Sequence, residues 1–120
     1  MIDGAYVERM ARYNRWQNEN LHSAADRLSE TERRRVRGAF WGSIHKTFNH
    51  PLWGDQIWMS WLTGSARPPV GIADSYADWT ALKAERVRFD QTIIDWATIA
   101  PSWLAAGERP ADTDLPFMPE

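Results

Sequence analysis

His22, His45 and His50 are the side chains of this 120-residue chain best suited to chemistry. Neutral imidazoles bind divalent metals, and they exchange protons near neutral pH. His45 and His50 are five positions apart, so a regular helix directs their side chains about 140° away from each other. One helix therefore cannot bring both rings to one ion, as the i, i+4 spacing of H-E-x-x-H does.

Residues 39–62 hold two of these histidines and have a helical period, which predicts a central helix packed on two or more neighbours. His45 falls in the narrow polar sector of this helix, where we expect it to face water. His50 falls on the flank of the apolar surface, where it could face a bundle interior. Pro51 removes the hydrogen bond to the Thr47 carbonyl and disfavours helical dihedral angles at His50, so we expect a kink or a freed carbonyl there.

The other segments also predict helices, so the fold class is all-α. We expect long helices over about residues 3–28 and 74–97, the first capped by Asp3 and the last by Asp74 or Ser75. A short helix should begin with the capping box Ser29–Glu32 and end near residue 38. We expect residues 1–104 to form one bundle domain and residues 105–120, with three prolines and no helical period, to form an irregular or disordered tail. The expected core contains Tyr13, Trp16, Ile44, Phe48, Trp58, Leu62, Leu82, Phe89, Ile93 and Trp96.

Several polar side chains interrupt the apolar pattern of these helices. Asn14, Asn18 and Asn20 lie in the first helix, where the choice is between solvated amides and a polar site inside the bundle. His22 lies roughly on the same face as Asn14, and we expect it at the surface. The solvated alternative is the better supported one for the asparagines.

Arg86 stands in the middle of an apolar helix face, as Asp55 does on the central helix. A buried charge needs a partner. One hypothesis is therefore that Arg86 pairs with Asp55 across the two helices, and the other is that Arg86 reaches only Asp90 at the surface, one turn further on. The sequence leaves both open.

Three phrases, ARYNRWQNENL, GAFWGSIHKT and TFNHPLWGDQIW, resemble the DinB family, and the resemblance runs from about Ala5 to about Leu104. It implies a four-helix bundle with three histidines on one divalent metal. His50 matches the first of these ligands, in the family's T-x-N-H motif. The other two lie on the family's last helix in a phrase like NHQTHHRGQ, which this chain lacks, and we expect the chain to end before that helix begins. Pro51 stands where the family usually has an apolar residue.

The resemblance implies a metal-dependent enzyme, a thiol-dependent transferase or a hydrolase acting on an unknown small molecule. With His50 as its single matching ligand, we expect the three-histidine site to be incomplete and nickel, zinc or iron to be bound weakly or not at all. The alternative is a non-catalytic helical module that dimerises through the face a missing helix would cover, with Trp53, Ile57 and Trp61 on that face.

Composition narrows the remaining classes of function. The chain has no cysteine, which excludes thiolate chemistry and fits a cytoplasmic protein. No stretch is long and apolar enough to span a membrane, so we expect no membrane partner. The arginines of residues 33–37 invite a nucleic-acid interpretation. However, the net charge is −2 and no aromatic residue is interleaved, so we expect no nucleic acid partner.

Overall fold

The computed structural model describes residues 3–68 and 74–105, with side chains described as far as residue 99. These residues form four helices, α1 (Gly4–Asp26), α2 (Glu30–Arg34), α3 (Ile44–Thr63) and α4 (Trp79–Ala105). The predicted all-α class, with three long helices and a short one after Ser29, is confirmed. The expected irregular tail lies outside the described residues except for residue 105, which ends α4.

Side-chain caps set where the helices begin. Asp3 accepts a hydrogen bond from the Tyr6 amide, and Ser29 accepts one from the Glu32 amide, as the sequence predicts. Ser43 caps α3 in the same way, so this helix begins at residue 44 rather than at residue 39. Residues 39–42 instead form a turn closed by a bridge between Ala39 and Gly42.

The bounds of α4 differ from the prediction at both ends. Asp78, rather than Asp74 or Ser75, accepts the hydrogen bond from the Ala81 amide and begins the helix. The helix also continues beyond residue 97 to Ala105, with Pro101 inside it. The apolar period that defined the helix fails after Trp96, but loss of an apolar stripe does not end a helix whose backbone hydrogen bonds continue.

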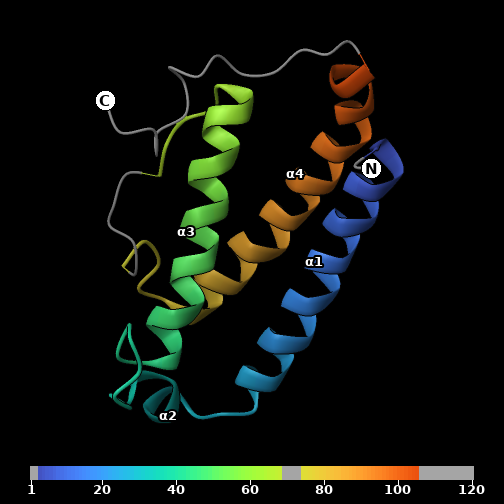
Figure 1. Ribbon diagram of the computed structural model, residues 1–120. Coiled ribbons are helices and arrows are strands. Elements are labelled where there is room, and N and C mark those ends of the chain that lie inside the picture. The colour runs from blue at the N-terminus through green and yellow to red at the C-terminus, as the bar shows by residue number, and fades with distance from the viewer. Residues whose placement is uncertain (1–2, 69–73, 106–120) are drawn as a thin grey trace.

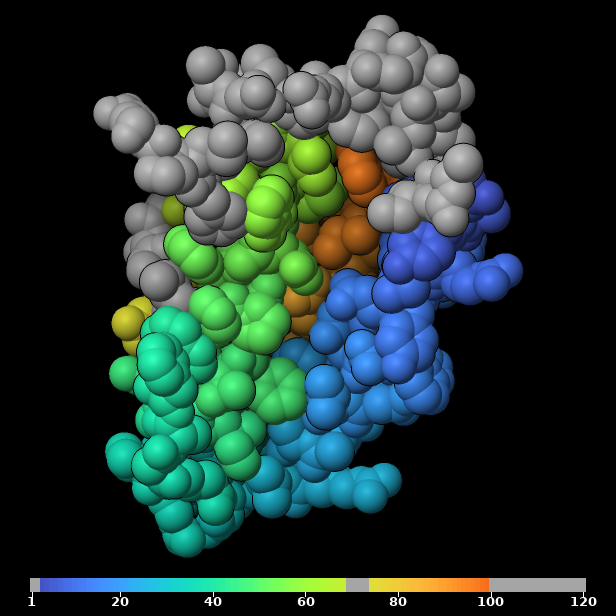
Figure 2. All heavy atoms as spheres, in the orientation of Figure 1, coloured from blue at the N-terminus to red at the C-terminus, as the bar shows by residue number. Residues whose placement is uncertain are grey.

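Figure 1 shows α4 between α3 and α1, with α2 at the start of α3. The main contacts run between α1 and α4, between α3 and α4, and between α2 and α3. In the space-filling view, α4 is visible between α3 and α1, at the bottom of a groove between them (Figure 2). No described helix combines the length and hydropathy that crossing a membrane would need.

The hydrophobic core lies where α3 and α1 meet α4. Leu82 and Phe89 are buried as predicted, and five other predicted core residues are partly buried against the same clusters: Ile44, Phe48, Leu62, Ile93 and Trp96. The prediction is wrong for three aromatic residues, which are 45–58% exposed: Tyr13, Trp16 and Trp58. The side that α1 turns to α4 carries small and polar residues instead, among them Ala11 and Ala25, so periodicity in large apolar residues selects the wrong face.

The face expected to be uncovered on α3 also needs correction. Ile57 is buried, with 8% of its surface exposed, and Trp53 and Trp61 are half-buried. The exposed aromatic residue of α3 is Trp58. Five of the ten large exposed apolar residues among those described lie on α1, so the largest uncovered apolar face of a helix is not the one that the sequence predicts.

Candidate functional site

A buried ion cluster joins α3 to α4. Arg86 is 3% exposed, and its Nη2 lies 2.6 Å from Oδ2 of Asp55 and 2.7 Å from Oδ1 of Asp90. Its Nε also donates to Asp90, at 2.9 Å. The predicted pair across the helices therefore forms. The alternative, a surface pair with Asp90 alone, is wrong because Asp90 is only 1% exposed.

Two asparagines of α1 extend this cluster to a third helix. Asn18 Nδ2 lies 3.1 Å from both carboxylate oxygens of Asp90, and Asn14 Nδ2 lies 3.4 Å from one of them. The polar-site alternative is therefore correct for these two residues, whereas Asn20 is exposed. Burial raises the pKa of Asp90 above its ordinary value, and the nearby Arg86 guanidinium acts in the opposite direction.

His22 lies one helical turn beyond Asn18 and is buried, with 4% of its surface exposed. Its ring centre is 4.5 Å from that of Phe48 and 5.2 Å from that of Trp79. Neither ring nitrogen has a hydrogen-bond partner among the described residues. Burial, reinforced by Arg86, lowers the pKa of His22 to about 4, so the ring is neutral at neutral pH. The predicted surface position is wrong because the Asn14–Asn18–His22 face turns toward α4.

A pocket of about 200 Å³ opens beside this cluster, between α1, α3 and α4. Its walls combine apolar and polar side chains: Asn18, Leu21, His22, Thr47, Phe48, Pro51 and Arg86. A smaller pocket, of about 110 Å³, shares Asn18, His22 and Arg86 and extends along α1 and α4 toward Lys83. These three residues therefore border two separate cavities.

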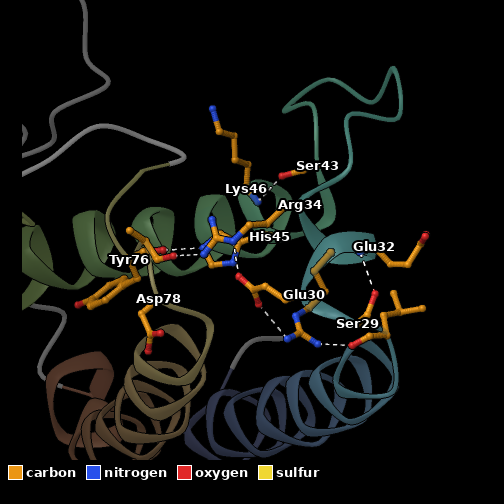
Figure 3. A network of polar contacts seen from close by, with 12 residues as sticks. Ser29, Glu30, Glu32, Arg34, Ser43, His45, Lys46, Tyr76 and Asp78 are labelled. Carbon is orange, nitrogen blue, oxygen red and sulfur yellow. Dashed lines mark hydrogen bonds and ion pairs between the residues drawn. The ribbon is translucent and has the colours of Figure 1, made fainter.

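His45 is a second histidine that the sequence places wrongly in water. It is 3% exposed, and its Nε2 donates a hydrogen bond of 2.7 Å to the carbonyl oxygen of Tyr76. Asn49, one turn further along α3, holds the same residue: its Oδ1 accepts from the Tyr76 amide at 2.8 Å, and its Nδ2 donates to the Tyr76 carbonyl at 3.0 Å. Figure 3 shows this junction between α3 and the segment before α4. The polar sector of α3 therefore holds the segment before α4 against α3 by hydrogen bonds to the Tyr76 main chain, and it does not face solvent.

His50 lies among aromatic rings. Its ring centre is 4.4 Å from that of Trp41, in the turn before α3, and 6.3 Å from that of Trp53. The ring is half-buried, and its Nδ1 is buried without a hydrogen-bond partner among the described residues. The α-helix continues through Pro51. Nδ1 of His50 is therefore not engaged in a hydrogen bond with any described residue.

A comparison with models of known protein families shows which family this chain is related to. The family model of the DinB family matches residues 1–118, almost the whole chain. The chain belongs to the DinB family. No curated protein and no solved structure gives a significant match. The family resemblance of the T-x-N-H phrase is thereby confirmed at the level of the domain.

The described residues of this DinB domain do not fit the three-histidine metal site that the resemblance implies. Within residues 3–68 and 74–105, no three His, Asp or Glu side chains lie close enough together to hold an ion. His22 packs against the Phe48 and Trp79 rings and His45 is hydrogen-bonded to Tyr76, and neither forms such a group with His50 among the described residues. His50 remains the single matching ligand position.

The arginines of residues 33–37 have partners within the domain. Arg33 donates to the Ala25 carbonyl at 3.3 Å, and its guanidinium lies 4.8 Å from the centre of the Trp79 ring. All four pair with glutamates of α2: Arg33 and Arg34 with Glu30, and Arg35 and Arg37 with Glu32. Arg34 also donates to the Ala77 carbonyl, beside the Tyr76 junction (Figure 3). The expectation of no nucleic acid partner stays a prediction, and these internal pairs give a structural role to the arginine run.

Proposed function

We propose that this 120-residue chain is a DinB-family domain with the scaffold of a metal-dependent transferase or hydrolase, in which His50 is the only ligand of the three-histidine site. On this proposal the chain binds divalent metal weakly and lacks the thiol-transfer or hydrolytic activity that the resemblance implies. The observation that most supports it is the separation of the histidines. His45 is hydrogen-bonded to Tyr76, and His22 is packed between Phe48 and Trp79.

The number of histidines that can reach one ion determines how tightly the chain binds metal. A catalytic site of this class uses three protein ligands and keeps an open position, where the metal lowers the pKa of a bound water or thiol. A two-fold dimer that brought two copies of His50 together would supply two ligands rather than three. Each missing ligand weakens binding, and a tenfold loss of affinity corresponds to about 1.4 kcal/mol. The proposed chain therefore loses its metal to a mild chelator.

Elemental analysis after dialysis against a mild chelator tests the proposal. The protein is first loaded with nickel, zinc or iron, and the wild-type chain is compared with His50→Ala. We expect both to retain far less than one ion per chain, because one imidazole does not make a tight site. Near-stoichiometric metal that disappears in His50→Ala would restore the enzyme assignment. Metal retained equally by both would mean that other residues hold it, which also contradicts the proposal.

A second candidate function is assembly, and exposed apolar residues along α1 favour it. Four of them lie within about 80° of one another on the helix: Tyr6, Met10, Tyr13 and Leu21. Each is between 44% and 56% exposed. Leu21 also lines the pocket toward α3, so this face borders the groove between α1 and α3. A large exposed apolar face is typical of an interaction surface.

A further inference from the structure

We infer that the pocket between α1, α3 and α4 is a binding site for a small neutral molecule that carries one hydrogen-bond acceptor on an apolar ring. The site is separate from the metal position, because His50 does not line it. It therefore does not depend on the function proposed above. Its recognition elements are the Arg86 guanidinium and the His22 ring, set among Leu21, Phe48 and Pro51.

Two buried polar side chains border this pocket without a complete set of partners. Arg86 uses Nε and Nη2 for the two aspartates, whereas its Nη1 is buried and has no hydrogen-bond partner among the described residues. Both ring nitrogens of His22 are likewise buried and have no hydrogen-bond partner among the described residues. Since a buried donor left unpaired is unfavourable, a ligand that supplies an acceptor to Arg86 gains more here than it would at a solvated arginine.

The charges around Arg86 select a neutral ligand. Carboxylate oxygens of Asp55 and Asp90 already lie 2.6 and 2.7 Å from Arg86 Nη2. An anion therefore gains little from this guanidinium, because it competes with acidic side chains that are already paired with it. A cation meets the guanidinium itself, and no carboxylate lines the pocket. A carbonyl or hydroxyl oxygen can accept from Nη1 without either penalty.

The size of the pocket limits the rest of the ligand. A cavity of about 150 Å³ lined by apolar side chains holds benzene. The present pocket, of about 200 Å³, has room for a six-membered ring and one small polar group. Its apolar walls, formed by Leu21, Phe48 and Pro51, suit the ring, and Asn18 and Thr47 leave room for further hydrogen bonds. Benzamide has this combination of size and chemistry.

Titration with three ligands of equal size tests the charge argument: benzamide, benzoate and benzylamine. Binding is followed by chemical-shift changes in the full 120-residue protein. We expect saturable binding of benzamide below about 10 mM, with benzoate and benzylamine at least about tenfold weaker. No saturation by benzamide, or equal affinity for benzoate, would overturn the inference.

A matched pair of substitutions tests the location. Thr47 and Thr98 are both exposed helical threonines that donate to a backbone carbonyl of their own helix, but only Thr47 lines the pocket. Thr47→Trp should obstruct the pocket and weaken benzamide binding at least about tenfold, whereas Thr98→Trp should leave it unchanged. Binding that survives Thr47→Trp would place the ligand elsewhere and refute the site. Because neither variant changes His50, the metal measurement remains independent of this result.

Discussion

Arg86 is the residue through which the three long helices are joined by polar contacts. Arg86 forms ion pairs with Asp55 of α3 and with Asp90 of its own helix. Asp90 in turn accepts hydrogen bonds from the amides of Asn14 and Asn18 on α1. A carboxylate that is 1% exposed is tolerated because four donors surround it, counting the two nitrogens of Arg86 and the two amides. The two aspartates are not equivalent, because the Asp55 side chain is 36% exposed.

We predict that Asp90→Ala destabilises the protein much more than Asp55→Ala. Removing Asp90 leaves Arg86 buried beside two asparagine amides that have lost their acceptor, which should lower the free energy of unfolding by about 3–5 kcal/mol. Removing Asp55 leaves Arg86 paired with Asp90. Because solvent already screens the contact between Asp55 and Arg86, the expected loss in the free energy of unfolding is about 1 kcal/mol. Urea unfolding measures both values.

Asp95→Ala is the control for this prediction, because Asp95 is an exposed aspartate of the same helix. We expect it to change the free energy of unfolding by less than about 0.5 kcal/mol. Equal losses for Asp55→Ala and Asp90→Ala would mean that the cluster does not have the buried centre described here.

At the scale of the elements, the sequence predicted the helices better than their faces. The caps at Asp3 and Ser29 are local patterns, and both formed as predicted. The orientation of α3 was not local information. His45 and Asn49 are polar, but their partners are main-chain groups of Tyr76, 27 or more residues away along the chain. Periodicity reports hydrophobicity, and it cannot show that a polar sector will be satisfied by a distant backbone.

The same limit explains the candidate site. On α1, the spacing Asn14–Asn18–His22 is i, i+4, i+8 and could have been recognised as one polar face. That this face is buried could not be predicted from α1 alone, because Asn18 binds Asp90, which lies 72 residues later in the chain. The short residues Ala11 and Ala25 bring α1 against α4, whereas the larger Tyr13 and Trp16 remain outside. Size at the contact, rather than hydrophobicity alone, decided which face was buried.

We predict that Asn49→Ala loosens the segment that precedes α4. Asn49 accepts from the Tyr76 amide and donates to its carbonyl, so alanine removes both contacts from a residue that is fully buried. The expected loss is about 1–3 kcal/mol in the free energy of unfolding, together with faster hydrogen exchange of the Tyr76 amide. Asn20→Ala, at an exposed position of α1, is the control and should change neither quantity. Unchanged exchange at Tyr76 in Asn49→Ala would contradict the prediction.

At the scale of the whole molecule, α4 is flanked by α1 and α3, and one face of it lies at the bottom of the groove between them (Figure 2). The proposed ligand pocket opens in this groove, and the exposed apolar face of α1 borders it. The DinB family resemblance predicted a bundle with room for a further helix. It did not predict that the apolar face would lie on α1 rather than on α3, because the register of α1 against α4 depends on the buried cluster.

The last prediction is that the chain is a homodimer assembled through this face of α1. Exposed apolar side chains along one helix are unfavourable in water, and a two-fold contact would bury the same residues on both copies. Light scattering at micromolar concentration should give about twice the chain mass of 13.9 kDa. Met10→Glu, at a position that is 44% exposed, should shift the mass toward that of one chain by placing two like charges in the contact. Val87→Glu, at an exposed apolar position of α4, is the matched control and should leave the dimer intact. A wild-type protein that stays at the mass of one chain, or a dimer that Met10→Glu leaves unchanged, would refute assembly through α1.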